Sequence, residues 1–291
     1  MDFKFIQNPV SGEWLISAPR RAKRPDIANG AEPVCPFCVG REKEEKEVYR
    51  VGGEPDDANW KIRVIPNKFP FAPIHEVIIH SPDHNKGFDE LPLEATKLIL
   101  ETYKQRFKTH QDKGQVYILH NHGKGGGESL PHPHSQLAVI PDNVTLQIPK
   151  LIEYLDADEH QETKELVISC PNLSIWPDEV WIYPKRRERT FGEITEEEIA
   201  DLARVLYRLI QIFDLRHGHE FPFNFYIYPG KDWYLRLIPR VKTLGGFELG
   251  TNVFINTQDP RKTIAFIKEH FECPNEEKIK GEHRATYRKA V

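Results

Sequence analysis

The feature that most constrains this chain is an internal repeat. Residues 75–91 read HEVIIHSPDHNKGFDEL, and residues 178–194 read DEVWIYPKRRERTFGEI. The matching positions stand 103 residues apart, and they pair Glu76, Val77, Ile79, Phe88 and Glu90 with Glu179, Val180, Ile182, Phe191 and Glu193. Self-similarity at a fixed spacing indicates two copies of one structural unit. The chain is therefore expected to fold as a duplication.

Each copy contains the same order of predicted elements. Apolar residues at helical spacing predict a helix from Pro92 to about His110. A capping box of Thr195 and Glu198 begins the equivalent helix, which is expected to end near Asp214. Apolar and β-branched runs predict the strands, at 60–66, 75–82, 116–122 and 135–141 in the first copy and within 223–230 and 235–240 in the second.

This order of elements predicts an α+β fold. Two strand-strand-helix-strand-strand units are expected to join into one broad antiparallel sheet with flanking helices. Residues 1–150 form the predicted N-terminal half and residues 151–291 the C-terminal half. Outside the repeat, we expect a hairpin with its turn at Pro9–Gly12, a loop at 26–34, a helix capped by Asp259 that ends near Phe271, and a partly disordered charged tail.

The charge balance argues against a polyelectrolyte or membrane partner. The chain has 40 basic and 44 acidic residues among 291, a formal net charge of −4. No field of one sign therefore draws it to nucleic acid or anionic lipid. No apolar run approaches the roughly 20 residues that span a bilayer. We expect a soluble, cytoplasmic protein whose partners are small molecules.

Two of the four cysteines form a CxxC pair, Cys35-Pro-Phe-Cys38. Two thiolates on a tight turn can share one tetrahedral zinc ion, but a structural site needs four ligands and the chain has no second CxxC. Histidines must then complete the site, and His84 and His132 are candidates beside predicted strands. The alternatives are an unligated surface turn and a thioredoxin-like redox pair, although no helix of the thioredoxin kind is predicted after Cys38. The other two cysteines, Cys170 and Cys273, are expected to be packed.

The segment LPHPHSQL places His132 and His134 on one face of a strand. Both can bind a metal, or one can bind metal while the other reacts, because neutral imidazole is a competent nucleophile toward phosphorus. The preceding glycine-rich loop, Gly123–Ser129, offers backbone N–H groups to phosphate oxygens, with Asn121 and Ser129 as further donors. It is not a P-loop, since no Gly-Lys-Ser/Thr closes it. The alternative is an ordinary flexible hairpin loop.

The second copy lacks this chemistry. At an offset of 98 residues, His132, His134 and Gln136 correspond to Gly230, Asp232 and Tyr234. The two copies therefore share a fold, and only the first is expected to carry a site.

Taken together, these motifs resemble the galactose-1-phosphate uridylyltransferase family of the histidine-triad superfamily. The resemblance covers most of the chain, through NPVSGEWLISAPRRAKRP, CPFC, RVIPNKFP, SPDH, the glycine-rich loop with HPHSQ, and GFELGTNVFIN. It implies two histidine-triad-like halves in one broad sheet and a homodimer. It also implies a zinc ion held by four ligands, Cys35, Cys38, His84 and His132.

The resemblance further implies that His134 attacks the α-phosphorus of a nucleotide sugar and carries the nucleotidyl group until a sugar 1-phosphate accepts it. Gln136 matches a phosphate-binding glutamine. An amide at this place can donate a hydrogen bond but cannot supply a proton, which favours transfer over hydrolysis. Asn121 and Ser129 match residues that contact phosphates.

Four further residues match substrate contacts of the family. Arg21 and Arg24 match arginines that approach the nucleotide phosphates, in their own chain or across the dimer, Asn67 matches a nucleoside contact, and Glu248 matches a glutamate that binds sugar hydroxyls. Without the resemblance, the arginines read as a solvated basic turn and Glu248 as a charge at a strand edge. No dissociable redox cofactor is implied.

The sequence departs from the family pattern in ways that affect specificity. Lys68 follows Asn67 where the pattern has aspartate, so uracil recognition does not follow. The second-copy strand lacks the histidines that often bind a second metal, and the chain is short, so galactose specificity does not follow either. The predicted activity is nucleotidyl transfer between sugar 1-phosphates. The alternatives are a phosphorylase or hydrolase of nucleotide sugars or dinucleoside polyphosphates, and a non-catalytic zinc-stabilised nucleotide-binding module.

Overall fold

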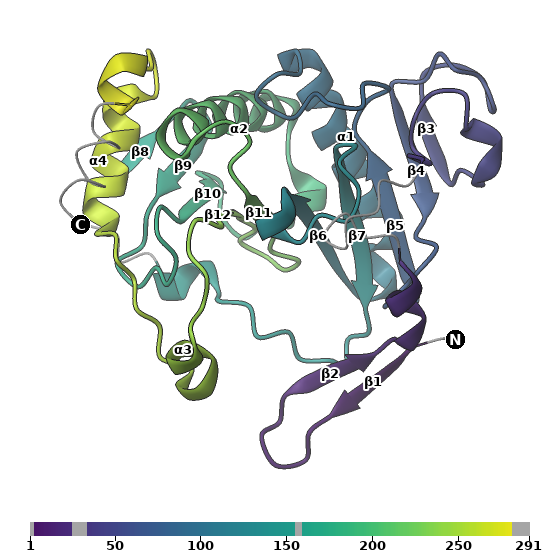
Figure 1. The fold of residues 1–291 in the computed structure, drawn as a ribbon, viewed down its shortest axis with the longest axis horizontal. Helices are drawn as coiled ribbons and strands as arrows, with labels where there is room; N and C mark the ends of the chain where they lie inside the picture. The colour runs from purple at the N-terminus through teal and green to yellow at the C-terminus, as the bar shows by residue number, and fades with distance from the viewer. Residues whose placement is uncertain (1–2, 25–33, 155–158, 281–291) are drawn as a thin grey trace.

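The computed structural model describes residues 3–24, 34–154 and 159–280, and its fold is mixed α+β (Figure 1). The strands are β1 (Lys4–Gln7), β2 (Trp14–Ser17), β3 (Tyr49–Val51), β4 (Ile62–Pro66), β5 (Ile74–Ile79), β6 (Gln115–His122), β7 (His134–Ile140), β8 (His160–Glu162), β9 (Leu166–Ser169), β10 (Val180–Pro184), β11 (Phe223–Ile227) and β12 (Leu235–Pro239). The α-helices are α1 (Leu93–His110), α2 (Glu196–His217), α3 (Gly246–Thr251) and α4 (Pro260–His270).

Ten of the strands form one antiparallel sheet in the order β3-β4-β5-β7-β6-β11-β12-β10-β9-β8. The order is symmetric about the contact between β6 and β11. Each half contributes five strands, and read outward from the centre they follow the same order: β6, β7, β5, β4 and β3 in the first half and β11, β12, β10, β9 and β8 in the second. The duplication and the single broad sheet predicted from the repeat are therefore confirmed.

One face of the sheet, here called the helix face, packs against α1, α2 and α4. The main apolar core lies there and runs across both halves without interruption. Its members include Ile78 of β5, Ile182 of β10 and Leu206 of α2, each fully buried. The opposite face, here called the site face, is covered by loops and by smaller apolar clusters. The continuous core fixes the two halves as one body.

The long helices begin where the sequence predicts. Thr195 caps α2, its side chain accepting from the Glu198 N–H while Glu198 reaches back to the cap. Three glutamates in the first turn and Arg216 with His217 in the last complement the helix dipole. The helix ends at His217, three residues past the predicted end, because Gly218 follows at φ 104°. Asp259 caps α4 as predicted.

The residue pairing inside the repeat differs from the sequence match. Ile78 of β5 and Ile182 of β10 belong to the core on the helix face, whereas Val77 and Ile79 pack in a cluster on the site face. A spacing of 103 would pair Ile79 with Ile182, which face opposite ways. Because side chains alternate along a strand, only an even spacing keeps the faces aligned.

The spacing of 98 for the next strand is also corrected. When the segment at 116–123 is matched with the segment at 223–230, which lies 107 residues later, Ile118 corresponds to Phe225. Ile118 pairs with Leu137 in the first half, and Phe225 pairs with Leu237 in the second. The register therefore places His134 and Gln136 at the positions of Tyr234 and Arg236, instead of Asp232 and Tyr234. The conclusion that the second half lacks histidines at this place is unaffected.

The remaining predictions concern the ends of the chain. The N-terminal hairpin of β1 and β2 is confirmed and projects from the body (Figure 1). Most of the predicted loop at 26–34 and the tail beyond residue 280 lie outside the described residues. Within the described chain, no helix combines the length and apolar character needed to cross a bilayer.

Candidate active site

The segment HPHSQ enters the sheet as the first half of β7. Val77 and Ile79 of β5 pair with Gln136 and His134, and all four side chains lie on the site face. Ser135 lies between them and faces the opposite way, where its hydroxyl contacts His80 and Tyr103. The strand period therefore presents His134 and Gln136 together. The prediction that His132 and His134 share a strand face is wrong, because β7 begins at His134 and His132 lies before it.

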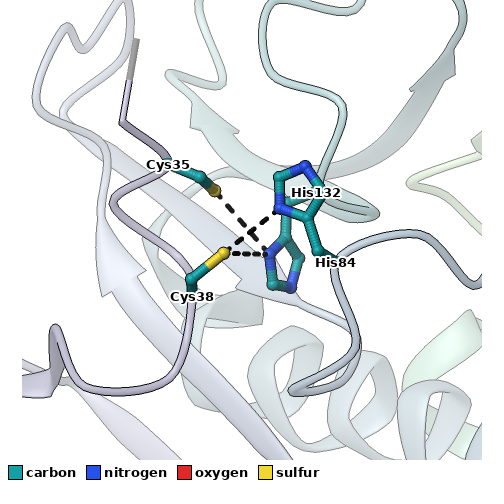
Figure 2. Close-up of side chains that lie close together, drawn as sticks. All are labelled: Cys35, Cys38, His84 and His132. Carbon is teal, nitrogen blue, oxygen red and sulfur yellow. Dashed lines mark hydrogen bonds between the residues drawn. The ribbon is translucent and has the colours of Figure 1, made fainter.

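Near the start of this strand in space, the side chains of four candidate metal ligands converge (Figure 2). The ligand atoms of Cys35, Cys38, His84 and His132 all lie within 4.8 Å of one another. Cys38 Sγ is 3.2 Å from His84 Nδ1 and 3.7 Å from His132 Nδ1, and Cys35 Sγ is also 3.7 Å from His132 Nδ1. A tetrahedral zinc with ordinary bond lengths places sulfur and nitrogen ligands about 3.6 Å apart. The residues present thus fit a bound metal ion.

The protonation chemistry of this cluster suits a cation. Burial raises the pKa of the Cys35 thiol to about 11 and lowers the pKa of His132 to about 4. His132 Nε2 lies 2.9 Å from the Ser81 carbonyl, which can only accept, so Nε2 carries the ring proton and Nδ1 offers its lone pair to the cluster. A bound cation would displace the thiol protons and stabilise thiolates that burial otherwise disfavours.

His134 is held in one tautomer by the backbone. Its Nδ1 lies 2.8 Å from the His132 carbonyl oxygen and must donate to it. The lone pair is then on Nε2. Burial lowers the pKa of the ring, so His134 is neutral at pH 7, and Phe37 packs on it with ring centroids 5.3 Å apart. The result is an oriented, unprotonated nitrogen.

His134 lines a cavity of about 320 Å³ on the site face. Of the residues predicted to contact substrate, Arg24, Asn67, Ser129 and Gln136 also line it. Further cations at this cavity come from three side chains, Lys23, Arg41 and Lys68, alongside two carboxylates, Glu44 and Glu45. Lys68 itself is largely exposed and pairs with Glu45. A chamber with excess positive charge beside a neutral imidazole suits a phosphorylated ligand.

His75 is a residue of this site that the sequence interpretation missed. The Phe71 N–H donates to His75 Nδ1 at 3.3 Å, so Nε2 carries the proton and donates to Gln136 Oε1 at 2.9 Å. Asn67 also donates to that oxygen, at 3.3 Å. With its oxygen occupied, the Gln136 amide directs its N–H groups elsewhere. The sequence does carry a signal for His75. It stands two residues before Val77 on the same strand, so the two side chains lie on the same face.

Three predicted contacts lie outside the cavity. Arg21 donates to the Phe69 carbonyl at 2.6 Å and lies over the Phe71 ring, so it braces the loop after β4. Asn121 on β6 is one position beyond the pair formed by His120 and Ser135, which makes it the next neighbour of His134 across the ladder.

Glu248, the third of these contacts, lies in α3, pairs with Lys242 and caps the helix at Gly245. The alternative view of Glu248 as a strand-edge charge is wrong. The two cysteines outside the cluster differ in burial. Cys170 is buried, as expected, whereas Cys273 is exposed, contrary to expectation.

The fold and the site define a class: a duplicated α+β protein with one ten-stranded sheet, a Cys/His cluster, and an oriented histidine in a cationic cavity. Residues 74–139 match the family described as galactose-1-phosphate uridyl transferase, N-terminal domain. This match confirms the predicted resemblance to the galactose-1-phosphate uridylyltransferase family.

Two curated relatives match along nearly their whole length. An ADP-glucose phosphorylase of Arabidopsis thaliana is 28% identical, with 90% of this chain and 92% of the relative covered. A galactose-1-phosphate uridylyltransferase of Thermotoga maritima is 26% identical, with 90% and 96% covered. Among solved structures, the Arabidopsis thaliana ADP-glucose phosphorylase with bound ADP-glucose has a TM-score of 0.69 at 26% identity and covers 92% of this chain and 99% of its own. A uridylyltransferase structure at 23% identity, with a TM-score of 0.73 over 93% and 99%, shows the same fold. The named relatives are enzymes that act on nucleotide sugars or sugar phosphates.

Proposed function

We propose that this protein is a nucleotidyltransferase that moves a nucleoside monophosphate between sugar 1-phosphates through a covalent nucleotidyl-His134 intermediate. The observation that carries the proposal is the orientation of His134. Its Nδ1 donates to the His132 carbonyl, and its neutral Nε2 belongs to a ring that lines the cationic cavity with Gln136.

The reaction proceeds in two displacements. His134 Nε2 attacks the α-phosphorus of a nucleotide sugar, a P–N bond forms, and the P–O bond to the departing sugar 1-phosphate breaks. The ring becomes cationic, and its remaining proton stays on Nδ1, where the His132 carbonyl stabilises it. A second sugar 1-phosphate then attacks the same phosphorus and releases neutral His134. Proton transfer to or from the imidazole is not required in either step.

Gln136 supports transfer over hydrolysis. His75 and Asn67 hold its oxygen, so the amide N–H groups can bind a phosphoryl oxygen as charge develops there. An amide cannot supply or remove the proton that activation of water requires. Arg24, Asn67 and Ser129 are proposed to bind the nucleotide, and Arg21, Asn121 and Glu248 to complete the substrate contacts.

We also propose zinc as the metal of the four-residue cluster. Two cysteines and two histidines are a common structural zinc set, and the sulfur to nitrogen distances fit its tetrahedron. The ion would tie the segment of Cys35 and Cys38 to the start of β7 and so fix the backbone that holds His134. Because thiolate ligands need reducing conditions, the cluster supports a cytoplasmic location.

A homodimer is proposed on the position of Glu248. It lies in α3, which projects from the C-terminal half away from β5 and β7 (Figure 1). The segment around it exposes several large apolar side chains, Val241, Phe247, Leu249, Val253 and Ile255. Exposed apolar residues gathered in one segment are typical of an interface. In this proposal, residues 1–150 carry the chemistry and the degenerate half, 151–291, supports assembly.

A second candidate is phosphorolysis, in which inorganic phosphate takes the nucleotidyl group. The similarity to an ADP-glucose phosphorylase over 90% of this chain favours it. Both reactions share the His134 intermediate and differ in the acceptor. Hydrolysis is disfavoured by Gln136, and a non-catalytic module by the complete His134, Gln136 and Ser129 set.

The covalent intermediate is tested by intact-mass spectrometry. Incubation with UDP-glucose or ADP-glucose should add one nucleoside monophosphate per chain, and chasing the adduct with glucose 1-phosphate, galactose 1-phosphate or inorganic phosphate identifies the acceptor. The His134→Asn variant should show no adduct. Equal labelling of that variant would refute the assignment.

A further inference from the structure

A side chain of the second half, Asn224 of β11, contacts two groups of the first half that lie close to His134 and Ser129. It lies directly opposite Asn121 in the central ladder that joins the halves. Its Nδ2 donates to Asn121 Oδ1 at 2.8 Å and to the Gly126 carbonyl at 2.7 Å. Its Oδ1 accepts from Arg240 Nη1 at 2.9 Å. All three groups of the Asn224 amide are thus engaged.

The orientation of this amide is determined by its partners. A guanidinium can only donate, so Asn224 Oδ1 must face Arg240. The Gly126 carbonyl can only accept, so Nδ2 must face the glycine-rich loop. Reversing the amide would bring two donors together at Arg240 and two acceptors together at Gly126. The usual ambiguity between amide oxygen and nitrogen does not arise here.

The fixed orientation of Asn224 dictates that of Asn121. Since Asn224 presents a donor, Asn121 must present Oδ1 to it, and its own Nδ2 points elsewhere. Within the described chain, Asn121 Nδ2 has no hydrogen-bond partner. Asn121 is half-buried on the site face, at the position across the ladder from His134. An oriented donor is therefore free beside the nucleophile.

The same side chain tethers the glycine-rich loop to the second half. At Gly126 a Cβ atom would lie 2.8 Å from the Phe223 carbonyl oxygen, and at Gly125 it would lie 3.0 Å from the Pro222 side chain. Only glycine permits so close an approach to β11. The loop then leads into Ser129, which lines the cavity. Asn224 thus contacts both Asn121, which lies across the ladder from His134, and the glycine-rich loop that leads to Ser129.

We infer that Asn224, held by Arg240, is a positioning residue that turns the Asn121 amide so that its Nδ2 donates to a phosphate oxygen of the bound nucleotide. The inference rests on the proposed function, since it assigns a phosphoryl ligand to the same cavity. It also gives the degenerate half a direct part in the site: Asn224 and Arg240 orient a donor that the first half supplies.

The Asn224→Asp variant tests this inference. The carboxylate keeps the size of the side chain and its bond to Arg240, but it presents acceptors to both Asn121 and the Gly126 carbonyl. The Asn121 amide should then turn its Nδ2 toward the new carboxylate and its Oδ1 toward the phosphate. A hydrogen bond to a charged group contributes about 1.5–3 kcal/mol, so the single-turnover rate of adduct formation should fall about 10- to 100-fold.

The matched control is Gln115→Glu. Gln115 lies on the same strand as Asn121 and donates its amide to the backbone carbonyls of Pro141 and Val144, so the change removes the same kind of bond and adds the same charge far from His134. Its adduct rate should stay within about threefold of wild type.

A double-mutant cycle separates orientation from general damage. If Asn224 acts through Asn121, then Asn224→Asp should cost at least about threefold less when added to Asn121→Ala than when added to wild type, because only the lost bond to Gly126 remains. An equal loss in both backgrounds, or a wild-type rate for Asn224→Asp, would overturn the inference. Should Asn224→Asp fail to fold, Asn224→Ala replaces it in the same cycle, with the same criterion.

A binding measurement distinguishes failure of this inference from failure of the proposed function. If the wild-type protein forms no adduct, the proposed function fails, and the affinity for UDP and ADP is then measured by calorimetry on the same set of variants. Affinity that falls at least tenfold in Asn224→Asp, and not in Gln115→Glu, still supports the positioning role. Affinity that does not change, or that is absent in all of the proteins, overturns it.

Discussion

At the scale of single residues, backbone carbonyls and buried side chains decide what each site residue can do. His134 is a nucleophile candidate because the carbonyl of His132, two residues earlier in the chain, fixes its tautomer. Gln136 is a donor because His75 and Asn67 occupy its oxygen. Neither property belongs to the residue type alone, since an unpartnered histidine or glutamine would sample both orientations.

The role of Gln136 predicts a charge effect at the cavity. Gln136→Glu keeps the shape and can still accept from His75, but it places a carboxylate beside the phosphates. Adduct formation should fall about 100-fold or more, because a donor is lost and a repulsive charge is gained. Stopped single-turnover assays measure the rate, and thermal unfolding checks the fold. A rate close to wild type would mean that Gln136 does not touch the phosphoryl group.

Glu128 predicts a pH effect on stability. It lies at the end of the glycine-rich loop, is 6% exposed, and accepts from the Gly123 N–H at 2.8 Å. Burial raises the pKa of this carboxyl from 4.5 to about 7. A raised pKa contributes stability that is fully present below pH 4.5 and is lost as the pH rises through about 7.

Glu128→Gln should therefore remove a pH-dependent cost. The glutamine keeps an acceptor for Gly123 and cannot ionise. Relative to wild type, the variant should gain stability from about pH 5 to pH 8, by up to about 3 kcal/mol. Denaturant unfolding at several pH values measures the difference. A constant difference across that range would show that the carboxyl is already ionised in the folded protein at pH 5, so that its pKa is not raised.

At the scale of elements, the metal cluster joins three parts of the chain: the turn of Cys35 and Cys38, the segment after β5 that carries His84, and the entry to β7 at His132. None of these segments is a long helix or a central strand. They therefore depend on the cluster for their mutual position, and the strand that carries His134 begins at its edge.

Removal of the metal should loosen this region and leave the sheet folded. We expect about one zinc per chain and a lower midpoint of thermal unfolding after chelation or in Cys38→Ser, since structural zinc contributes to folding free energy. The exposed Cys273 provides the control, because Cys273→Ser should keep both zinc and stability. Undiminished zinc in a Cys38→Ser, His84→Ala variant would exclude this site.

The sequence was informative about elements wherever one periodicity dominated. The helix caps at Thr195 and Asp259 and the strand that holds His134 are where the patterns place them. The register between repeats was not predictable from identities, because a one-residue shift preserves a run of apolar letters while it reverses every face. Asn224 and His75 were missed for a related reason: their roles come from contacts across the ladder, between residues distant in the chain.

At the scale of the whole molecule, the symmetric sheet sets the division of labour between halves. The second half has Tyr234 and Arg236 where the first has His134 and Gln136. Arg236 is engaged by Glu179 at 2.7 Å, and Tyr234 stacks on Trp181. A buried ion pair and aromatic packing replace the reactive face, so this half retains the fold and loses the nucleophile. This half still contributes Asn224, which lies on β11 next to the first half, and Glu248, which lies in α3.

The position of Glu248 leads to a prediction about assembly. Glu248 is remote from the cavity of its own chain, yet the family resemblance assigns it a sugar contact. If α3 instead reaches the cavity of a second copy, each site contains His134 from one chain and Glu248 from the other. Light scattering should then give the mass of a dimer, and Phe247→Asp and Leu249→Asp, which add charge to exposed apolar positions, should give monomers.

Mixed dimers test the shared site directly. His134→Asn and Glu248→Ala chains should each be nearly inactive alone. When they are unfolded and refolded together in equal amounts, about half of the dimers pair one chain of each kind, and one of the two sites in such a dimer keeps both residues. About a quarter of the wild-type activity should therefore return. If each chain supplied both residues to its own site, no mixture would contain an intact site, and the activity would stay at the level of the separate variants.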